Sequence, residues 1–208
     1  AATLGGNVAE NSGGPHCFKY GVTSNHVLGL TVILPDGEIA RIGGKAPDVP
    51  GYDLTGAFVG SEGTLGICTE LTVRIVRLAE GVKTLLAIYD SIEAGGESVS
   101  AIVAAGMVPA TLEMMDQLVI KAVEESIKCG LPTDCATVLI IEVDGLKDDL
   151  ERQAQEIADL CRKHGAREVR LAKTDAERAA LWAGRRGAFG AVARITPSYL
   201  VCDGTVPR

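Results

Sequence analysis

Two glycine-punctuated segments in the first third of the chain contain the residue types that line a cofactor site. They read ATLGGNVAENSGG at residues 2–14 and FVGSEGTLGICTE at residues 58–70. Glycine has no Cβ, so a ligand can approach main-chain N–H groups, and the Thr, Asn and Ser residues between the glycines add polar atoms. The two segments therefore predict backbone-lined walls of a cleft that holds an anionic cofactor.

The spacing of the second segment does not fit a nicotinamide site. Gly60, Gly63 and Gly66 recur at every third position, whereas the Rossmann fingerprint needs G-x-G-x-x-G between a strand and a helix. Glycine-rich segments are more often simple turns than ligand sites. On these residues alone, both interpretations stay open.

Arg185 is the side chain best suited to hold an anion in the second half of the chain. It lies on an apolar stripe of a predicted helix, and this stripe comprises Leu181, Phe189 and Val192. A planar guanidinium binds a carboxylate through two parallel hydrogen bonds, so a substrate carboxylate is one candidate partner. The alternative is that Arg185 pairs with Glu113 or Asp203, or extends to solvent.

The three histidines do not indicate a metal site. His16, His26 and His164 show no metal-ligand spacing, and neither H-E-x-x-H nor E-x-x-H occurs. We therefore predict no metal ligand within this chain.

The elements that must position these residues divide into two parts that join near residues 78–82. In the first part, the segments 27–34 and 38–42 flank Pro35-Asp36-Gly37, whose Pro and Gly suit a turn, so they predict a β-hairpin. Residues 66–76 are expected to form a long strand. The glycine-rich segments around them are expected to be loops.

The second part alternates strands and helices. The predicted strands are 83–89, 111–115, 137–143 and 168–171. The predicted helices include 92–105, 117–128 and 175–194. A further helix precedes the strand 168–171; Asp148 or Asp149 is expected to cap its start, and Gly165 to end it. This order predicts an α+β sandwich of ferredoxin-like type, with an inserted helix and one face of the sheet covered.

Composition narrows the class of protein. The 208 residues are 47% hydrophobic, which suffices for a core, and the net charge of −7 argues against nucleic acid as a partner. No apolar run reaches the length of a transmembrane segment. Six cysteines without a C-x-x-C pair favour a reducing, cytoplasmic setting.

Several motifs together resemble a known family. GGNVAENSGG, YGVTSNHVLG, PDG, GSEGTLG, LEMMD, the W-x-x-R of Trp182 and Arg185, and DGTVPR occur in this order and are similar to the FAD-linked D-2-hydroxyacid oxidoreductases, which oxidise substrates such as glycolate or D-lactate. The resemblance covers the whole chain. It implies the C-terminal half of a PCMH-type FAD-binding domain at 1–80, followed by a ferredoxin-like substrate (cap) domain at 81–208.

The resemblance also implies which residues contact the cofactor FAD. The expected contacts are Thr3, Gly5, Gly6, Asn7, Asn11, Ser12, Gly13, Gly14, Glu62, Gly63, Thr64, Gly66 and Ile67. Arg185 would bind the substrate carboxylate while a hydride equivalent passes from the hydroxyl-bearing carbon to FAD. The chain would be an internal fragment, inactive alone, whose general base and any metal lie outside it.

Partners and location follow from the same resemblance. It implies a small 2-hydroxy acid substrate and partner subunits of a glycolate oxidase complex, with a cytoplasmic location or membrane association through those subunits. A different class of protein stays open as an alternative, a non-catalytic regulatory module of ferredoxin-like fold that binds a small molecule. Such a module would not need the glycine-rich segments that are expected to contact a flavin.

Overall fold

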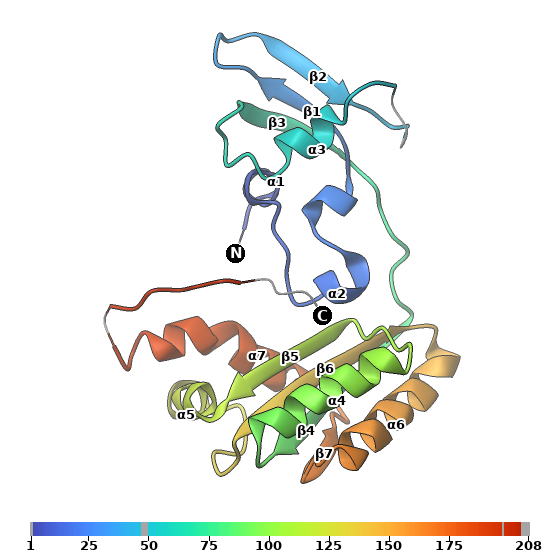
Figure 1. Ribbon diagram of the computed structural model, residues 1–208, viewed down its shortest axis with the longest axis vertical. Coiled ribbons are helices and arrows are strands. Elements are labelled where there is room, and N and C mark those ends of the chain that lie inside the picture. Colours follow the sequence, from blue (N-terminus) through green and yellow to red (C-terminus); the bar gives the residue numbers. More distant parts are fainter. Residues whose placement is uncertain (1, 47–49, 197, 205–208) are drawn as a thin grey trace. The chain divides into compact units, whose positions relative to one another are not determined.

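The computed structural model describes residues 2–46, 50–196 and 198–204 (Figure 1). The last four residues of the DGTVPR segment therefore lie outside the described residues. The structure divides into two compact units, Ala1–Ala79 and Glu80–Arg208. Each unit has its own sheet and core, and each is described by itself.

The first unit contains a three-stranded antiparallel sheet of order β2-β1-β3. The predicted hairpin is confirmed, since β1 (Val27–Ile33) pairs with β2 (Ile39–Gly43) across a turn in which Glu38 N donates to Asp36 Oδ1 at 3.0 Å. β3 (Ile67–Val73) is shorter than the predicted strand 66–76. The prediction of a longer strand was wrong because the chain leaves the sheet after Val73.

Three short helices replace the loops that we expected in the first unit. They are α1 (Leu4–Glu10), α2 (Cys17–Tyr20) and α3 (Leu54–Phe58), with a 3₁₀ turn at Thr23–Asn25. Thr3 begins α1 because its Oγ1 accepts a hydrogen bond from Gly6 N at 3.0 Å. Asp53 caps α3 in the same way through Gly56 N at 2.8 Å. The caps satisfy first-turn N–H groups that would otherwise lack a partner within the helix.

The second unit confirms the predicted α+β class and the alternating order of elements. Its strands are β4 (Gly81–Tyr89), β5 (Thr111–Asp116), β6 (Thr137–Gly145) and β7 (Glu168–Leu171), and its helices are α4 (Ile92–Ala104), α5 (Gln117–Ser126), α6 (Lys147–Lys163) and α7 (Asp175–Val192). The strands form an antiparallel sheet of order β5-β6-β4-β7. This is the order of a ferredoxin-like sheet, with α5 inserted between β5 and β6.

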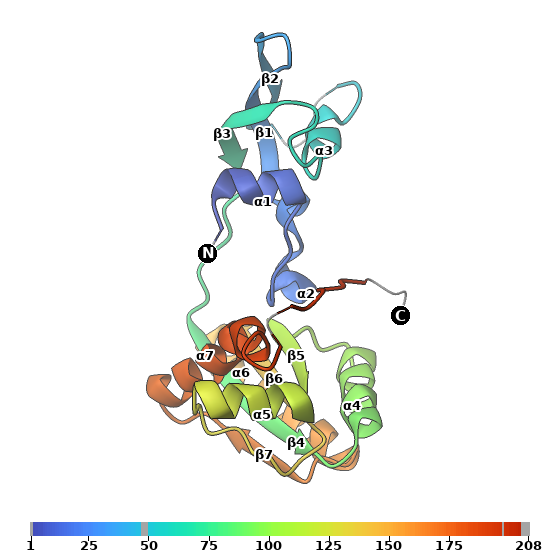
Figure 2. The ribbon, with the colours of Figure 1, turned by 90° about the vertical axis from the view of Figure 1, so that its left-hand side faces the viewer.

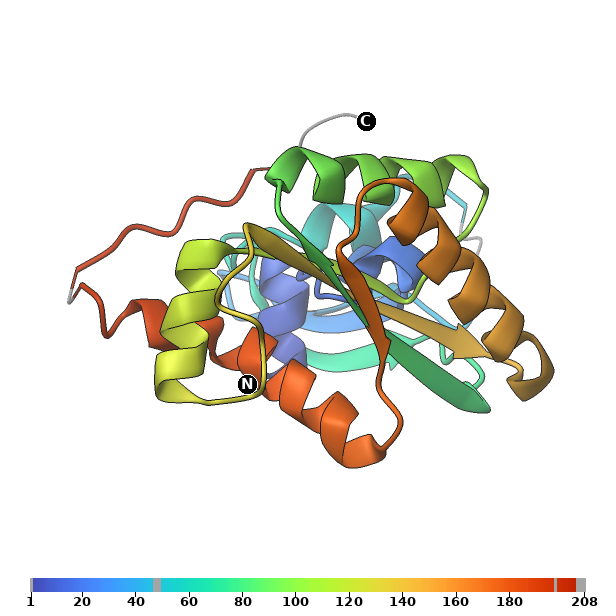
Figure 3. The same ribbon diagram turned by 90° about the horizontal axis from the view of Figure 1, so that it is seen from below.

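Helices cover both faces of this sheet, so the prediction of one covered face was wrong. Figure 3 shows α4 and α6 on one side and α5 and α7 on the other. The central strand β4 explains the difference, because Leu85 and Ala87 pack into the α4–α6 core while Leu86 and Ile88 pack into the α5–α7 core. A strand buried on both faces needs an apolar layer on each side.

Two predicted helix ends also differ from the structure. The N-cap of α6 is Leu146, and Asp149 lies in the first turn, where it accepts hydrogen bonds from Arg152 and Gln153 instead of capping. At the end of α5, Lys128 takes a left-handed backbone with φ 56°, so the helix stops at Ser126. Among the described residues, none of the helices has the length and apolar character needed to cross a bilayer.

Candidate functional site

The two glycine-punctuated segments meet in the first unit around one hollow of about 260 Å³. Its lining comprises Thr3, Gly5, Gly6, Val8, Ala9, Phe58, Ser61, Gly63, Gly66, Ile67 and Cys68. One wall is α1 and the other is the turn that leads into β3. The two segments, which are far apart in the sequence, therefore build one site.

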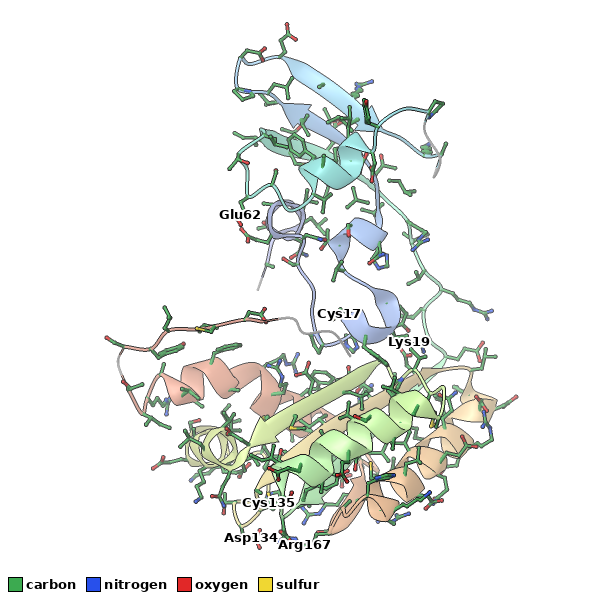
Figure 4. All side chains as sticks on the ribbon, in the orientation of Figure 1. Cys17, Lys19, Glu62, Asp134, Cys135 and Arg167 are labelled. Atoms are coloured by element: carbon green, nitrogen blue, oxygen red, sulfur yellow. The ribbon has the colours of Figure 1, made fainter. Side chains whose placement is uncertain are left out.

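Backbone hydrogen bonds hold the turn against α1. Gly60 N donates to Val8 O and Glu62 N donates to Ala9 O, each at 2.8 Å. Figure 4 labels Glu62 on this turn beside α1. Glu62 has a left-handed φ of 53° and Gly63 one of 76°. The positive φ values bring the turn back toward the helix, and glycine adopts such values without strain.

The backbone of this hollow is open to a ligand at two glycines. A Cβ added at Gly5 or at Gly63 would have no heavy atom within 4 Å, so these positions form a cradle that a side chain would fill. Gly66 differs, since a Cβ there would lie 2.5 Å from Ile33 O. The open cradle fits the approach of part of an FAD molecule to the main chain. Its volume is below the 300–1,000 Å³ of typical ligand pockets, so it can hold only part of that cofactor.

The structure brings six of the thirteen expected cofactor contacts together in this hollow. These six are Thr3, Gly5, Gly6, Gly63, Gly66 and Ile67. The other seven, Asn7, Asn11, Ser12, Gly13, Gly14, Glu62 and Thr64, do not line it.

Three of these seven residues shape the turns next to the hollow. Asn11 ends α1 with a left-handed φ of 48°, and its Oδ1 accepts a hydrogen bond from Ser24 N at 2.9 Å. The Ser12 carbonyl accepts from Thr23 Oγ1 at 2.8 Å. Thr64 Oγ1 donates to Ser61 O at 2.6 Å. These bonds fix the two walls from outside the hollow.

Sequence reasoning did not select Val8, Ala9, Phe58, Ser61 or Cys68 as lining residues. Val8 and Phe58 are buried, and their apolar character marks them as core and not as site residues. Ser61 follows Gly60 and precedes the expected contact Glu62, and the sequence indicated it only as one of the polar residues between the glycines.

A second hollow, of about 550 Å³, lies in the second unit and includes Arg185. Its lining comprises Glu113, Met114, Met115, Asp116, Val119, Arg185, Ala188, Phe189, Val192, Tyr199, Leu200, Val201 and Cys202. Strand β5, helix α7 and the segment after α7 supply most of these residues. The hollow is mainly apolar, and three charged side chains, Glu113, Asp116 and Arg185, belong to its lining.

Arg185 forms an ion pair with Glu113 inside this second hollow. Arg185 Nε lies 2.6 Å from Glu113 Oε2, and the two side chains are 27% and 18% exposed. Of the partners that the sequence left open, Glu113 is therefore the one in contact. Within the described residues, Asp203 makes no ion pair with Arg185.

Trp182 contacts a second carboxylate one turn earlier on α7. Its Nε1 donates to Glu142 Oε2 at 2.8 Å, and Thr84 Oγ1 donates to the same oxygen at 2.8 Å. Glu142 is only 6% exposed, so these donors supply the hydrogen bonds that a buried carboxylate requires. The Trp182–Glu142 bond holds the W-x-x-R segment against β6, and the Arg185–Glu113 ion pair holds it against β5.

The described part of the chain contains no group of three or more His, Cys, Asp or Glu side chains arranged to hold a metal ion. Its six cysteines are free thiols.

Comparison with known protein families identifies the class of protein to which this chain belongs. Residues 78–208 match the C-terminal domain of FAD linked oxidases, and residues 1–43 match the FAD binding domain. The chain belongs to the FAD-linked oxidases, and FAD is the cofactor of this family. These matches confirm the resemblance seen in the motifs.

Three individual proteins show which members of this family the chain resembles. The chain is 47% identical over 208 residues to glycolate oxidase subunit GlcD of Escherichia coli (strain K12) and 50% identical to GlcD of Bacillus subtilis (strain 168). It is 34% identical over 214 residues to D-lactate dehydrogenase of Anaerostipes hadrus. These alignments cover 99–100% of this chain but 42%, 44% and 45% of the relatives. The chain thus spans less than half the length of these relatives.

Solved structures confirm the fold. Alkyldihydroxyacetonephosphate synthase aligns with 93% of this chain and 37% of its own at a TM-score of 0.69 and 18% identity. p-Cresol methylhydroxylase aligns with 90% of this chain and 44% of its own at a TM-score of 0.68 and 17% identity. At these identities the likeness concerns the fold alone.

Proposed function

We propose that this chain supplies one wall of the FAD site and the substrate arginine of an enzyme that oxidises a small D-2-hydroxy acid. The substrate would be glycolate or D-lactate, and the product the 2-oxo acid. The observation that carries this proposal is the hollow in which α1 meets the GSEGTLG turn, with open backbone at Gly5 and Gly63. Membership of the FAD-linked oxidases favours an enzyme over the alternative of a regulatory module.

The cofactor role extends over both glycine-rich segments. We assign contacts with FAD to Thr3, Gly5, Gly6, Asn7, Asn11, Ser12, Gly13, Gly14, Glu62, Gly63, Thr64, Gly66 and Ile67. Six of them line the hollow, and residues such as Asn11 and Thr64 support it by shaping the adjacent turns. When bound, FAD would accept the hydride equivalent that leaves the hydroxyl-bearing carbon.

Arg185 would bind and orient the substrate carboxylate. Its Nε is occupied by Glu113, while its two terminal nitrogens have no partner among the described residues. A planar fork with two donors suits a carboxylate. We assign no general base among the described residues, so the role of this chain is binding and orientation.

Partner subunits would carry the electrons onward. The GlcD relatives are named as subunits of glycolate oxidase, which supports a complex of several chains. The location we propose is cytoplasmic, with membrane association through such partners. Co-purification of the tagged protein with subunits of a glycolate oxidase complex tests this part of the proposal.

The role of Arg185 is tested by substitution in the flavoprotein holoenzyme that contains this chain. Arg185→Ala removes the fork, and we expect kcat/KM for glycolate or D-lactate to fall at least about tenfold, equivalent to about 1.4 kcal/mol of transition-state binding. Arg186→Ala is the matched control, because its Nε donates to the carbonyl oxygen of Trp182 within the helix. An Arg185→Ala enzyme with unchanged kcat/KM would contradict the proposed role.

The cofactor role is tested at the open cradle. Gly5→Val would place a side chain at a position of the hollow where a Cβ meets no heavy atom within 4 Å, so we expect the fold to persist and the affinity for FAD to fall about tenfold or more. Gly44→Val is the control, since a Cβ at Gly44 also meets no heavy atom within 4 Å but lies outside the hollow. The ratio of flavin absorbance to protein after gel filtration measures the difference. Equal flavin content in both variants would argue against a contact between this hollow and FAD.

A further inference from the structure

We propose that Glu113 is a positioning residue, which holds the Arg185 guanidinium by its Nε so that the two terminal nitrogens face the substrate carboxylate. This inference rests on the proposed function and adds a second residue to it. It gives the Arg185–Glu113 ion pair a specific task beyond joining α7 to β5.

The atoms in contact support this role. Glu113 Oε2 accepts a hydrogen bond from Arg185 Nε at 2.6 Å, and Nε is the donor nearest the stem of the side chain. A carboxylate that bound both terminal nitrogens would use the fork that a ligand needs. Because Glu113 binds Nε alone, it fixes the plane of the guanidinium and leaves the terminal N–H groups available.

The elements that carry Glu113 and Arg185 are held in place by the core of the second unit. Glu113 lies on β5 opposite Ile140 of β6, which belongs to the core. Arg185 lies one turn beyond Trp182, whose indole bond to the buried Glu142 sets the position of α7 over the sheet. Both members of the pair therefore project from elements that the core holds in place, as preorganised binding requires.

The charges in the second hollow define what the pair does to a ligand. Its lining holds one cation, Arg185, and two carboxylates, Glu113 and Asp116. Asp116 Oδ1 is engaged as the cap of α5 through Val119 N at 2.9 Å. Since Glu113 offsets the charge of Arg185, a substrate carboxylate is attracted by two oriented donors and not by net positive charge. Orientation should therefore matter more here than the charge of residue 113.

Two substitutions separate orientation from charge in the flavoprotein holoenzyme. Glu113→Asp keeps the charge but withdraws the oxygen from Nε by one methylene, whereas Glu113→Gln keeps an acceptor oxygen at the same reach but removes the charge. We expect Glu113→Asp to raise KM for D-lactate and glycolate and to lower kcat/KM about tenfold to a hundredfold, the range that a displacement near 1 Å can cause. Glu113→Gln should give a KM no higher than that of the parental enzyme.

A double substitution tests whether Glu113 acts through Arg185. In the Arg185→Lys background, Nε is lost, so Glu113→Asp should cause less than a twofold further change in kcat/KM. The same loss in both backgrounds would overturn the inference. So would a Glu113→Asp enzyme with parental KM, or a Glu113→Gln enzyme impaired as strongly as Glu113→Asp. Flavin content and melting temperature show that each variant is folded.

The kcat/KM of Arg185→Ala distinguishes a failure of the positioning role from a failure of the proposed function. If Arg185→Ala lowers kcat/KM and Glu113→Asp does not, the positioning role fails and the proposed function stands. If Arg185→Ala also leaves kcat/KM unchanged, the assignment of the substrate arginine itself fails.

Discussion

Single residues on the inner face of α7 connect this helix to the sheet through carboxylates. Trp182 donates to Glu142 and Arg185 to Glu113, so helix positions three residues apart bind acidic residues of β6 and β5. Burial of Glu142 is acceptable because its Oε2 accepts two hydrogen bonds. The W-x-x-R motif therefore has a structural task in addition to the binding role that we propose.

Removal of the indole donor should destabilise the second unit. In Trp182→Phe, Glu142 Oε2 keeps only the bond from Thr84, and a hydrogen bond to a charged group contributes about 1.5–3 kcal/mol. We expect the free energy of unfolding in urea to fall by about 2 kcal/mol. Unchanged stability would show that the contact is not needed for α7 to pack.

The cysteines should differ in reactivity with pH. Burial and the neighbouring Glu124 carboxylate, which accepts from Sγ at 3.1 Å, raise the pKa of the Cys129 thiol to about 12. An unfolded thiol ionises near pH 8.5. The stability contributed by the protonated thiol is thus complete below about pH 8.5 and is lost as the pH rises toward about 12.

Alkylation with iodoacetamide at pH 9 provides the measurement. We expect the exposed Cys17 and Cys202 to react first, while Cys129 reacts only after unfolding. Mass spectrometry of tryptic peptides gives the order. Modification of Cys129 as fast as Cys17 would contradict a half-buried thiol that stays protonated at this pH.

Sequence reasoning reached Arg185 but could not choose its partner. The helical spacing placed Arg185 on the inner stripe, and Glu113 was one of two acidic candidates. The choice depends on which strand β5 pairs with and on the register of that pairing, which are long-range properties. Local patterns do not determine such properties.

At the level of elements, α5 and α7 lie side by side on the same face of the sheet (Figure 2). A Cβ at Gly184 would lie 2.5 Å from Cys129 Sγ and 3.2 Å from Val123 Cγ1. Cys129 has little freedom to move, because Glu124 binds both its backbone N–H and its Sγ. Gly184 therefore permits the close approach that orients α7, and with it Arg185.

This contact predicts opposite effects for two glycines of α7. Gly184→Ala should lower the melting temperature because the Cβ forces α5 and α7 apart, at a cost of about 1–3 kcal/mol. Gly190→Ala is the matched control, since its Cβ would meet no heavy atom within 4 Å. It should raise stability by up to about 1 kcal/mol through helix propensity. A Gly184→Ala variant as stable as Gly190→Ala would exclude tight packing at this position.

The elements of the second unit were predictable because their apolar residues recur with clear periods, as in α6 with Leu150, Ala154 and Ile157 on one side. The helix α1 was missed because Gly5 and Gly6 have low helix propensity. The cap at Thr3 and the bonds from the 60–62 turn outweigh that propensity. The hydrogen bonds from the turn join segments about fifty residues apart, so the local sequence does not show them.

At the scale of the whole molecule, the chain consists of two units joined near residue 80. Residues 1–43 of the first unit match the FAD binding domain, and residues 78–208 match the C-terminal domain of FAD linked oxidases. The division into a partial FAD-binding domain at 1–80 and a partial substrate (cap) domain at 81–208 stays a prediction. Both hydrophobic clusters of the second unit, one on each face of its sheet, draw all their residues from within that unit. This self-contained core indicates a unit able to fold independently.

Expression of residues 80–208 alone tests this independence. We expect a single cooperative unfolding transition in urea, followed by circular dichroism, because the described core residues of this unit all belong to the segment itself. The full chain is the control. A non-cooperative transition of the isolated segment would show that the first unit contributes to its stability.

The most direct test of the central claim follows the visible absorbance of the flavin under anaerobic conditions, in the parental holoenzyme and in Arg185→Ala, after addition of D-lactate or glycolate. Our account predicts that the parental flavin bleaches rapidly on reduction, and that Arg185→Ala holds the same amount of FAD but is reduced at least about tenfold more slowly at low substrate concentration. A parental flavin that neither acid reduces, or equal rates of reduction in the two proteins, would contradict it.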